Sequence, residues 1–115
     1  MHLSTHKSGD VLVVNLEGDQ LNSKHRKIMQ ETLEPLLFPG IKLALGLGRL
    51  KDAEASGYQF FLSLYQRVRS IGGDLKVFSL SHPSLRFTYE KLCLHKKIQT
   101  FNHKEEALRA FAPVD

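Results

Sequence analysis

Short runs of apolar residues alternate along the chain with segments in which apolar residues recur every three or four positions. The apolar runs are short and bounded by glycine or polar residues, as is typical of buried strands. Four runs predict such strands: 11–16, 43–47, 75–80 and 98–101. The polar, alternating segment 3–7 predicts an edge strand that joins the first run through a turn at 8–10. Two glycines near the second run, Gly46 and Gly48, indicate close backbone packing.

Four segments with helical periodicity follow these strands in turn. They begin near Ser23, Gly57, Pro83 and Asn102. Pro35 predicts a kink or an end in the first, because proline cannot donate a backbone hydrogen bond, and Gly72-Gly73 ends the second. The positions expected to face inward are Ile28, Met29, Leu33, Leu36, Leu37, Phe61, Leu64, Tyr65, Val68, Ile71, Leu85, Tyr89, Leu92, Ala107, Leu108 and Phe111. The alternation predicts an α/β fold with a mixed sheet of four to five strands and about four helices.

Two helix starts have the spacing of a capping box. Ser56 precedes Gln59 by three residues, and Asn102 precedes Glu105 by three. In this arrangement the first side chain accepts a hydrogen bond from a free backbone amide, and the second reaches back to the cap. We therefore expect Ser56 to cap the second helix and Asn102 the last one.

Composition is that of one ordinary folded domain. The chain has 115 residues, of which 42% are hydrophobic and 24% charged, so we expect a single domain spanning 1–115. The lone cysteine, Cys93, fits a reducing compartment and forms no internal disulfide. The first ten residues lack the apolar core of a signal peptide, and no apolar run approaches the roughly 20 residues that cross a bilayer. We expect a cytoplasmic protein without direct membrane insertion.

The net charge of +4 is too small to indicate nucleic-acid binding. The basic clusters at 24–27 and 95–97 contain no aromatic residue, so they are interpreted as solvated helix surfaces. The six histidines lie on different predicted elements and lack the i, i+4 spacing of helical metal ligands. They are expected at the surface, and neither a metal nor a cofactor is assigned.

No catalytic constellation is recognisable. Cys93 lies between two leucines, which predicts a buried and inert thiol. The pair Gly46 and Gly48 lacks the third glycine and the following helix of a dinucleotide site. The Gly-Lys-Ser/Thr of a phosphate-binding loop is absent. We therefore assign no catalytic residue and expect a protein that is not an enzyme.

The most specific segment is 43–73. It runs from a strand through Glu54-Ala55-Ser56-Gly57 into an amphipathic helix, which ends at Gly72-Gly73 before another apolar strand. This order resembles the STAS domain, the SpoIIAA-like family of bacterial anti-sigma-factor antagonists, whose members have Asp-Ser-Ser-Gly before that helix. The segments 11–18, 81–85 and 105–108 are similar to the opening strand, the Ser-Pro helix start and the closing helix of the family, so the resemblance covers nearly the whole chain.

The chain departs from the family pattern at two positions. In phosphorylated members, a partner kinase phosphorylates the first serine of Asp-Ser-Ser-Gly, and Ala55 stands there without an oxygen. Gly46 stands where the family often has Asp or Asn. The second serine of the motif is retained as Ser56, which is either a structural cap or an alternative phosphosite. Glu54 either stabilises the helix N-terminus through its negative charge or binds the partner.

The resemblance implies a regulator that binds a protein partner, namely an anti-sigma factor or a related regulatory kinase. Phosphorylation would add about −1.5 to −2 charges to such a docking surface. Because Ala55 has no hydroxyl, this charge would not be added at that position. The expected partner-binding residues are Asp52, Glu54, Ala55, Ser56, Gly57 and Tyr58. Two alternatives remain open: an accessory subunit of a lipid-transport ABC system, and a module that binds a nucleotide or another anion at the helix N-terminus beside Arg49 and Lys51. We assign no oligomeric state.

Overall fold

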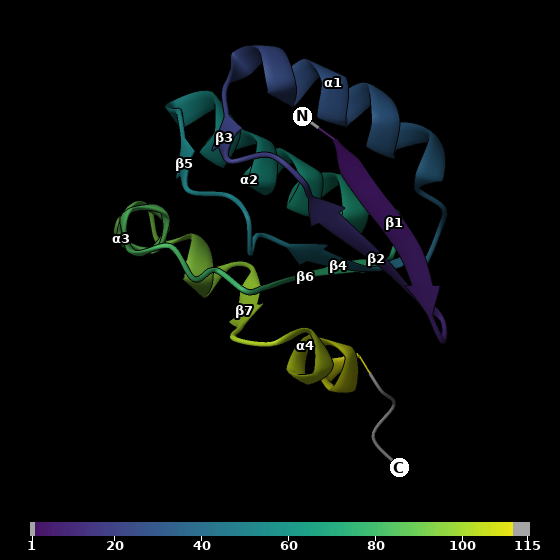
Figure 1. The fold of residues 1–115 in the computed structure, drawn as a ribbon. Helices are drawn as coiled ribbons and strands as arrows, with labels where there is room; N and C mark the ends of the chain where they lie inside the picture. Colours follow the sequence, from purple (N-terminus) through teal and green to yellow (C-terminus); the bar gives the residue numbers. More distant parts are fainter. Residues whose placement is uncertain (1, 112–115) are drawn as a thin grey trace.

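A five-stranded mixed sheet forms the centre of the molecule (Figure 1). The computed structural model describes residues 2–111. The strands are ordered β1-β2-β4-β6-β7 across the sheet. Their bounds are Leu3–Ser8 (β1), Val11–Leu16 (β2), Lys42–Gly46 (β4), Asp74–Phe78 (β6) and Gln99–Phe101 (β7). The predicted α/β class and the mixed sheet are confirmed.

Only the first strand runs against its neighbour. The antiparallel β1 pairs with β2 from Leu3 opposite Leu16 to Ser8 opposite Val11, so the predicted hairpin is confirmed. Gly9 turns this hairpin with a φ of 63°, a conformation that glycine adopts without steric cost. The pairs β2–β4, β4–β6 and β6–β7 are parallel. The carboxyl ends of these parallel strands therefore lie along one edge of the sheet.

Helices cover both faces of the sheet (Figure 1). On one face lie α1 (Ser23–Leu33), continued by the 3-10 turn η1 (Glu34–Leu36), and α2 (Ala55–Ser70). On the other face lies α4 (Lys104–Ala110), while α3 (Pro83–Lys91) and the 3-10 turn η2 (Leu94–Lys96) connect β6 to β7. Pro35 takes the first turn of η1 directly after α1 ends, as its missing amide predicts.

The main core lies between the sheet and the pair α1 and α2. The buried side of α2 is formed by Phe60, Phe61, Leu64 and Val68, and α1 contributes Met29 and Leu33. A smaller core on the opposite face contains Val13, Phe78 and Ala107. The expectation that Ile28 and Leu36 face inward is wrong, since they are 40% and 37% exposed.

The end of α3 also differs from the prediction. Leu92 is 52% exposed and Cys93 is exposed, whereas both were expected to face the core. Cys93 has a φ of 59°, so the chain reverses there and places Leu94, not Leu92, in the core. Periodicity along α3 could not reveal this, because a left-handed residue breaks the helical repeat.

The predicted cap of the last helix is wrong as well. The N-terminal cap of α4 is His103, whose side chain makes no capping hydrogen bond. Asn102 lies in the bend between β7 and α4, and its carbonyl accepts a hydrogen bond of 3.4 Å from the Ser79 hydroxyl.

None of the helices described between residues 2 and 111 is long and apolar enough to cross a bilayer.

Candidate functional site

The candidate site lies at the edge where β2, β4 and β6 end. Ligand and partner sites of parallel α/β sheets are commonly found there, because the connecting loops converge at the carboxyl ends of the strands. The loop after β4 leads into α2 and contains the segment that resembles the STAS motif. It is flanked by the loop after β2 and by the loop between β6 and α3.

Two very short strands hold the loop after β4 in place. These are β3 (Gln20–Leu21) and β5 (Asp52–Ala53), which pair in parallel as a separate two-stranded sheet. The amides of Lys51 and Asp52 donate to the Asp19 carbonyl at 2.8 and 3.1 Å, and the Glu54 amide donates to the Leu21 carbonyl at 2.9 Å. Main-chain hydrogen bonds therefore fix the position of the loop where it enters α2.

The N-terminus of α2 is presented to solvent. Glu54 is its cap residue, with an extended backbone and no capping hydrogen bond from its side chain. Ala55 is the first helical residue, and both side chains are exposed. The Glu54 carbonyl accepts from the Gly57 amide at 2.8 Å, which starts the helix. Glu54 places its carboxylate near the positive end of the helix dipole, where negative charge is stabilising.

Ser56 does not cap this helix, so that prediction is wrong. Because α2 begins at Ala55, Ser56 already lies within the first turn, and its hydroxyl is buried without a hydrogen-bond partner. Gln59 does not reach back to a cap residue. Its side-chain oxygen accepts instead from the guanidinium of Arg26 in α1, at 3.4 Å. The helix thus starts two residues earlier than predicted, and the hydroxyl turns inward.

Gly57 allows α2 to pack closely against β3 and β5. A Cβ at this position would lie 2.9 Å from Cγ of Leu21, 3.0 Å from the Leu21 carbonyl oxygen and 3.1 Å from Cβ of Ala53. These distances are shorter than van der Waals contacts, so a side chain would push the helix away. The glycine is therefore required by packing, and it is itself buried.

Tyr58 is also buried, with 4% of its surface exposed. Its ring meets Phe61 edge to face, with 6.2 Å between the centroids. Burial raises the pKa of Tyr58, and hydrogen bonding with the side chain of Thr88 in α3 partly offsets this effect. Of the six expected binding residues, Asp52, Glu54 and Ala55 offer exposed side chains, whereas Gly57 and Tyr58 support the corner from within.

The expected anion site contains carboxylates as well as basic groups. A hollow of about 660 Å³ beside the loop is lined by Glu17 and Asp19 together with Arg49, Lys51 and His82. Nε of Arg49 lies 3.1 Å from the carboxylate of Glu17. Nδ1 of His82 is buried and has no hydrogen-bond partner. An anion in this hollow would meet two carboxylates, so the charges do not favour it.

Gly46 departs from the family pattern because a neighbouring strand occupies its space. A Cβ here would lie 2.3 Å from Oδ1 of Asn15 and 2.6 Å from Cζ of Phe78. Asn15 in β2 thus places an amide beside the position where the family often has a polar residue in β4. The predicted close packing at Gly46 is confirmed, whereas a Cβ at Gly48 would make only an ordinary contact of 3.5 Å.

A larger hollow elsewhere has fewer features of a site. It measures about 710 Å³ and lies between α1 and α2 over the apolar side chains of Leu33, Phe60 and Leu64. The ion pair of Glu34 and Arg67, at 2.7 Å, bridges the two helices there. Among the described residues, no group of three His, Cys, Asp or Glu side chains is arranged to hold a metal ion.

These features define a small α/β domain with an exposed loop-and-helix corner at the carboxyl edge of its sheet. The family model of the STAS domain matches residues 2–107, and the chain belongs to this family. The resemblance that the segment 43–73 indicated is therefore confirmed. Comparison with the curated proteins found no match.

Solved structures share the fold at low sequence identity. An anti-sigma-factor antagonist (STAS) domain protein from Planctomyces limnophilus has a TM-score of 0.86 and 16% identity, over 96% of this chain and 98% of that one. Phosphorylated SpoIIAA, the Bacillus cell fate determinant, has a TM-score of 0.70 and 16% identity, over 96% and 100%. The murine anion transporter Solute Carrier 26 family member A9 has a TM-score of 0.74 and 14% identity, over 91% of this chain and 18% of that one.

Several features that shape the corner have no recognisable pattern in the sequence. β3 and β5 are two residues long and too short for a hydrophobic period. The Asp19 carbonyl that holds the loop is a main-chain group, which no side-chain pattern encodes. The close approach of Gly57 to Leu21 joins residues 36 positions apart in the chain. Gly18 before β3 was the one local signal of a turn in this region.

Proposed function

We propose that this chain is a regulator without enzymatic activity that binds a protein partner in the manner of an anti-sigma-factor antagonist. The partner is an anti-sigma factor or a related regulatory kinase, and it docks on the corner formed by Asp52, Glu54 and Ala55. Support comes from the STAS family match, from anti-sigma-factor antagonists of the same fold, and from the exposure of this corner on a main-chain scaffold.

The observation that carries the proposal is the arrangement of Ala55 and Ser56. Ala55 is exposed at the first position of α2, and its methyl side chain cannot be phosphorylated. Ser56 has a hydroxyl, but that oxygen is buried in the first turn. The corner thus presents a docking surface without an accessible phosphate acceptor, and binding at this corner is expected to persist when kinase and ATP are present.

The test uses purified chain and the purified anti-sigma-factor kinases of the same genome. Calorimetry measures the dissociation constant before and after incubation with ATP. We expect one kinase to bind, with the same affinity in both cases. Ala55→Ser is expected to take up phosphate and to lose affinity, because the added charge lies on the docking corner.

Ala110→Ser is the matched control, since Ala110 is exposed at the end of α4 and on another face. It should neither take up phosphate nor change the affinity. Failure of every kinase to bind the unaltered chain would contradict the proposal. Stoichiometric phosphoserine at Ser56 that releases the kinase would contradict the claim that the corner lacks an acceptor.

A second candidate function is an accessory role in a membrane transport system, which extends the lipid-transport alternative. A STAS-fold segment also occurs within a murine anion transporter, of which this chain matches 18%. Such a domain would bind a transporter subunit through the same corner and would need no phosphorylation. This second function would be supported if the chain copurified with a transport ATPase and not with an anti-sigma-factor kinase.

A further inference from the structure

The outer surface of α3 and of the turns that follow it, up to Lys97, combines exposed apolar and basic side chains. Phe87 is 68% exposed and Leu92 is 52% exposed, the two highest values among the large hydrophobic residues described. We define the α3 patch by six residues: Arg86, Phe87, Lys91, Leu92, Lys96 and Lys97. Within 83–97, four basic side chains stand against the single carboxylate of Glu90. The patch is therefore both apolar and positively charged.

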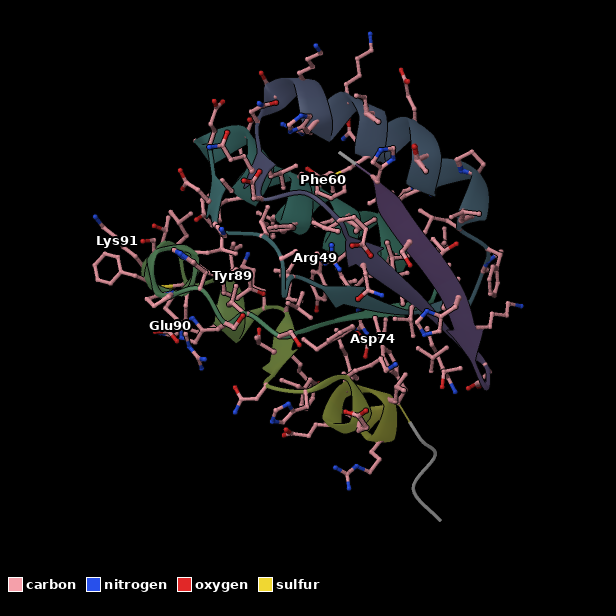
Figure 2. All side chains as sticks on the ribbon, in the orientation of Figure 1. Arg49, Phe60, Asp74, Tyr89, Glu90 and Lys91 are labelled. Atoms are coloured by element: carbon pink, nitrogen blue, oxygen red, sulfur yellow. The ribbon has the colours of Figure 1, made fainter. Side chains whose placement is uncertain are left out.

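Core packing does not account for the exposed side chains of the patch. The inward face of α3 is completed by Leu85 and Tyr89, both 0% exposed, and Leu94 closes the core after the turn. Figure 2 shows Tyr89 directed towards the sheet, whereas Glu90 and Lys91 project away from it. An exposed aromatic ring surrounded by charges is typical of an anchor that a partner buries.

The α3 patch is continuous with the proposed docking corner. α3 contacts β5, the short strand that contains Asp52 of the corner. Phe87 and Lys91 are four residues apart and share a face of the helix. A partner that covers Asp52 and Glu54 therefore lies close enough to reach α3 as well (Figure 1).

We propose that the α3 patch is the second half of the partner-binding surface and takes an acidic region of the protein partner, with Phe87 inserted into an apolar pocket. This inference rests on the proposed function. The corner is acidic through Asp52 and Glu54, while the α3 patch is basic, so the whole surface fits a protein with a basic and an acidic region side by side. An anionic membrane would attract the patch but be repelled by the adjoining corner.

The test measures affinity for the anti-sigma-factor kinase that binds the unaltered chain in the calorimetric experiment above. Phe87→Ala is expected to raise the dissociation constant by about tenfold or more, as truncation of a central aromatic anchor does. The double variant Lys96→Glu with Lys97→Glu is expected to raise it roughly fivefold and to weaken its dependence on salt. Both variants should melt at the same temperature as the unaltered chain, because these side chains are exposed.

Matched controls come from the opposite end of the molecule. Phe38 is 45% exposed before β4, so Phe38→Ala removes an aromatic ring of similar exposure. Lys7→Glu with Arg109→Glu reverses two exposed charges, one on β1 and one at the end of α4. Both controls are expected to leave the dissociation constant within about twofold.

The outcomes separate the two proposals. If no kinase binds the unaltered chain, the proposed function fails and this inference fails with it. If the kinase binds and Phe87→Ala binds equally well, this inference alone is overturned. A second measurement is cosedimentation with vesicles of phosphatidylcholine and phosphatidylglycerol in equal parts. If the unaltered chain cosediments and Phe87→Ala does not, the α3 patch binds an anionic membrane and the inference of a protein partner is overturned. Absence of cosedimentation supports the protein partner.

Discussion

Two glycines set the geometry of the site because each lies where a side chain has no room. At Gly57 a Cβ would overlap Leu21 of β3, and at Gly46 it would overlap Asn15 of β2 and Phe78 of β6. Neither has a positive φ, so both are required by space and not by backbone conformation. The close approach of α2 to β5 thus depends on a missing methyl group.

Gly57→Ala is expected to destabilise the protein by about 1 kcal/mol. Alanine favours a helix by up to about 1 kcal/mol over glycine, but crowding a packed site costs about 1–3 kcal/mol. The clash should prevail, because Cγ of Leu21 is buried and its carbonyl oxygen belongs to the backbone. Urea denaturation monitored by circular dichroism measures the change.

Gly48→Ala, in the loop that leads to α2, is the control, since its Cβ would lie 3.5 Å from the nearest atom. Its effect on the free energy of unfolding should be within about 0.5 kcal/mol. Equal stability of both variants would show that α2 does not press on β3 in solution.

At the scale of elements, a buried lysine fastens α4 to the sheet. Lys76 in β6 is 5% exposed and donates to Asp74 at 3.1 Å and to the side-chain oxygen of Gln99 in β7. Its ammonium group lies 5.0 Å from the ring centroid of Phe111, just after α4. The short helix α4 therefore depends on a charged contact as well as on the small second core.

Lys76→Ala is expected to lower the free energy of unfolding by about 2 kcal/mol, because it removes the hydrogen bonds to Asp74 and Gln99 and leaves a gap under Phe111. Lys76→Met should lose less, since it keeps most of the side-chain volume. Urea denaturation gives the totals, and hydrogen exchange should show faster exchange of the α4 amides.

Lys42→Ala in the neighbouring strand is the control. Lys42 pairs with Asp10 at 2.7 Å, but the Asp10 side chain is 74% exposed and that of Lys42 is 34% exposed, so water weakens the pair and the loss should be small. If removal of Lys76 costs no more than removal of Lys42, the buried lysine does not hold α4 in place.

The sequence predicted the long elements better than the ends of the helices. Two long elements were confirmed. The apolar run 11–16 forms a strand, and the helical spacing of Phe61, Leu64 and Val68 forms the buried side of a helix. The caps at Ser56 and Asn102 were wrong, because several helix starts within one or two residues fit the same spacing.

The corner could be predicted only in part. Its motif Glu54 to Gly57 identified the region, but which of these side chains face outward depends on packing against β3 and α3. Cys93 shows the same limit, since its left-handed backbone reverses a burial pattern that the neighbouring leucines suggest. Contacts between distant segments decide such cases, and a single sequence does not encode them in a local pattern.

At the scale of the whole molecule, the main core is closed by two tyrosines as well as by apolar residues. Tyr58 and Tyr89 are 4% and 0% exposed, and Tyr89 lies 6.4 Å from Phe61 between ring centroids. The hydroxyl of Tyr89 accepts a hydrogen bond from Thr100 of β7 at 3.3 Å. Burial raises the pKa of Tyr89 to about 12, an effect that the hydrogen bond with Thr100 opposes.

Stability is therefore expected to fall as the pH rises from about 10 to 12. In the unfolded chain Tyr89 loses its proton near pH 10, while in the folded protein it stays neutral until its raised pKa is reached. The unfolded state thus binds fewer protons, and the free energy of unfolding decreases by roughly 2 to 3 kcal/mol over this interval. Urea denaturation at a series of pH values measures the slope.

Tyr89→Phe should have a flatter profile in this range, because the ionisable hydroxyl is gone while the ring remains. All other ionisable groups are the same in both proteins, so the difference between the two profiles isolates Tyr89. Parallel profiles would mean that Tyr89 ionises in the folded protein as readily as in the unfolded chain.

The corner before α2 is held by main-chain atoms, namely the amides of Lys51, Asp52 and Glu54 on the carbonyls of Asp19 and Leu21. The outward side chains of Asp52, Glu54 and Ala55 take no part in those main-chain bonds. Asp52 does make a bond of its own, since its Oδ1 accepts from the Ala53 amide at 2.9 Å. The identities of Glu54 and Ala55 can therefore be exchanged while the backbone keeps its shape. This separation makes the chain a scaffold for engineering: libraries randomised at these two positions should yield folded variants with new selectivity, so that several copies could operate in one cell without cross-talk.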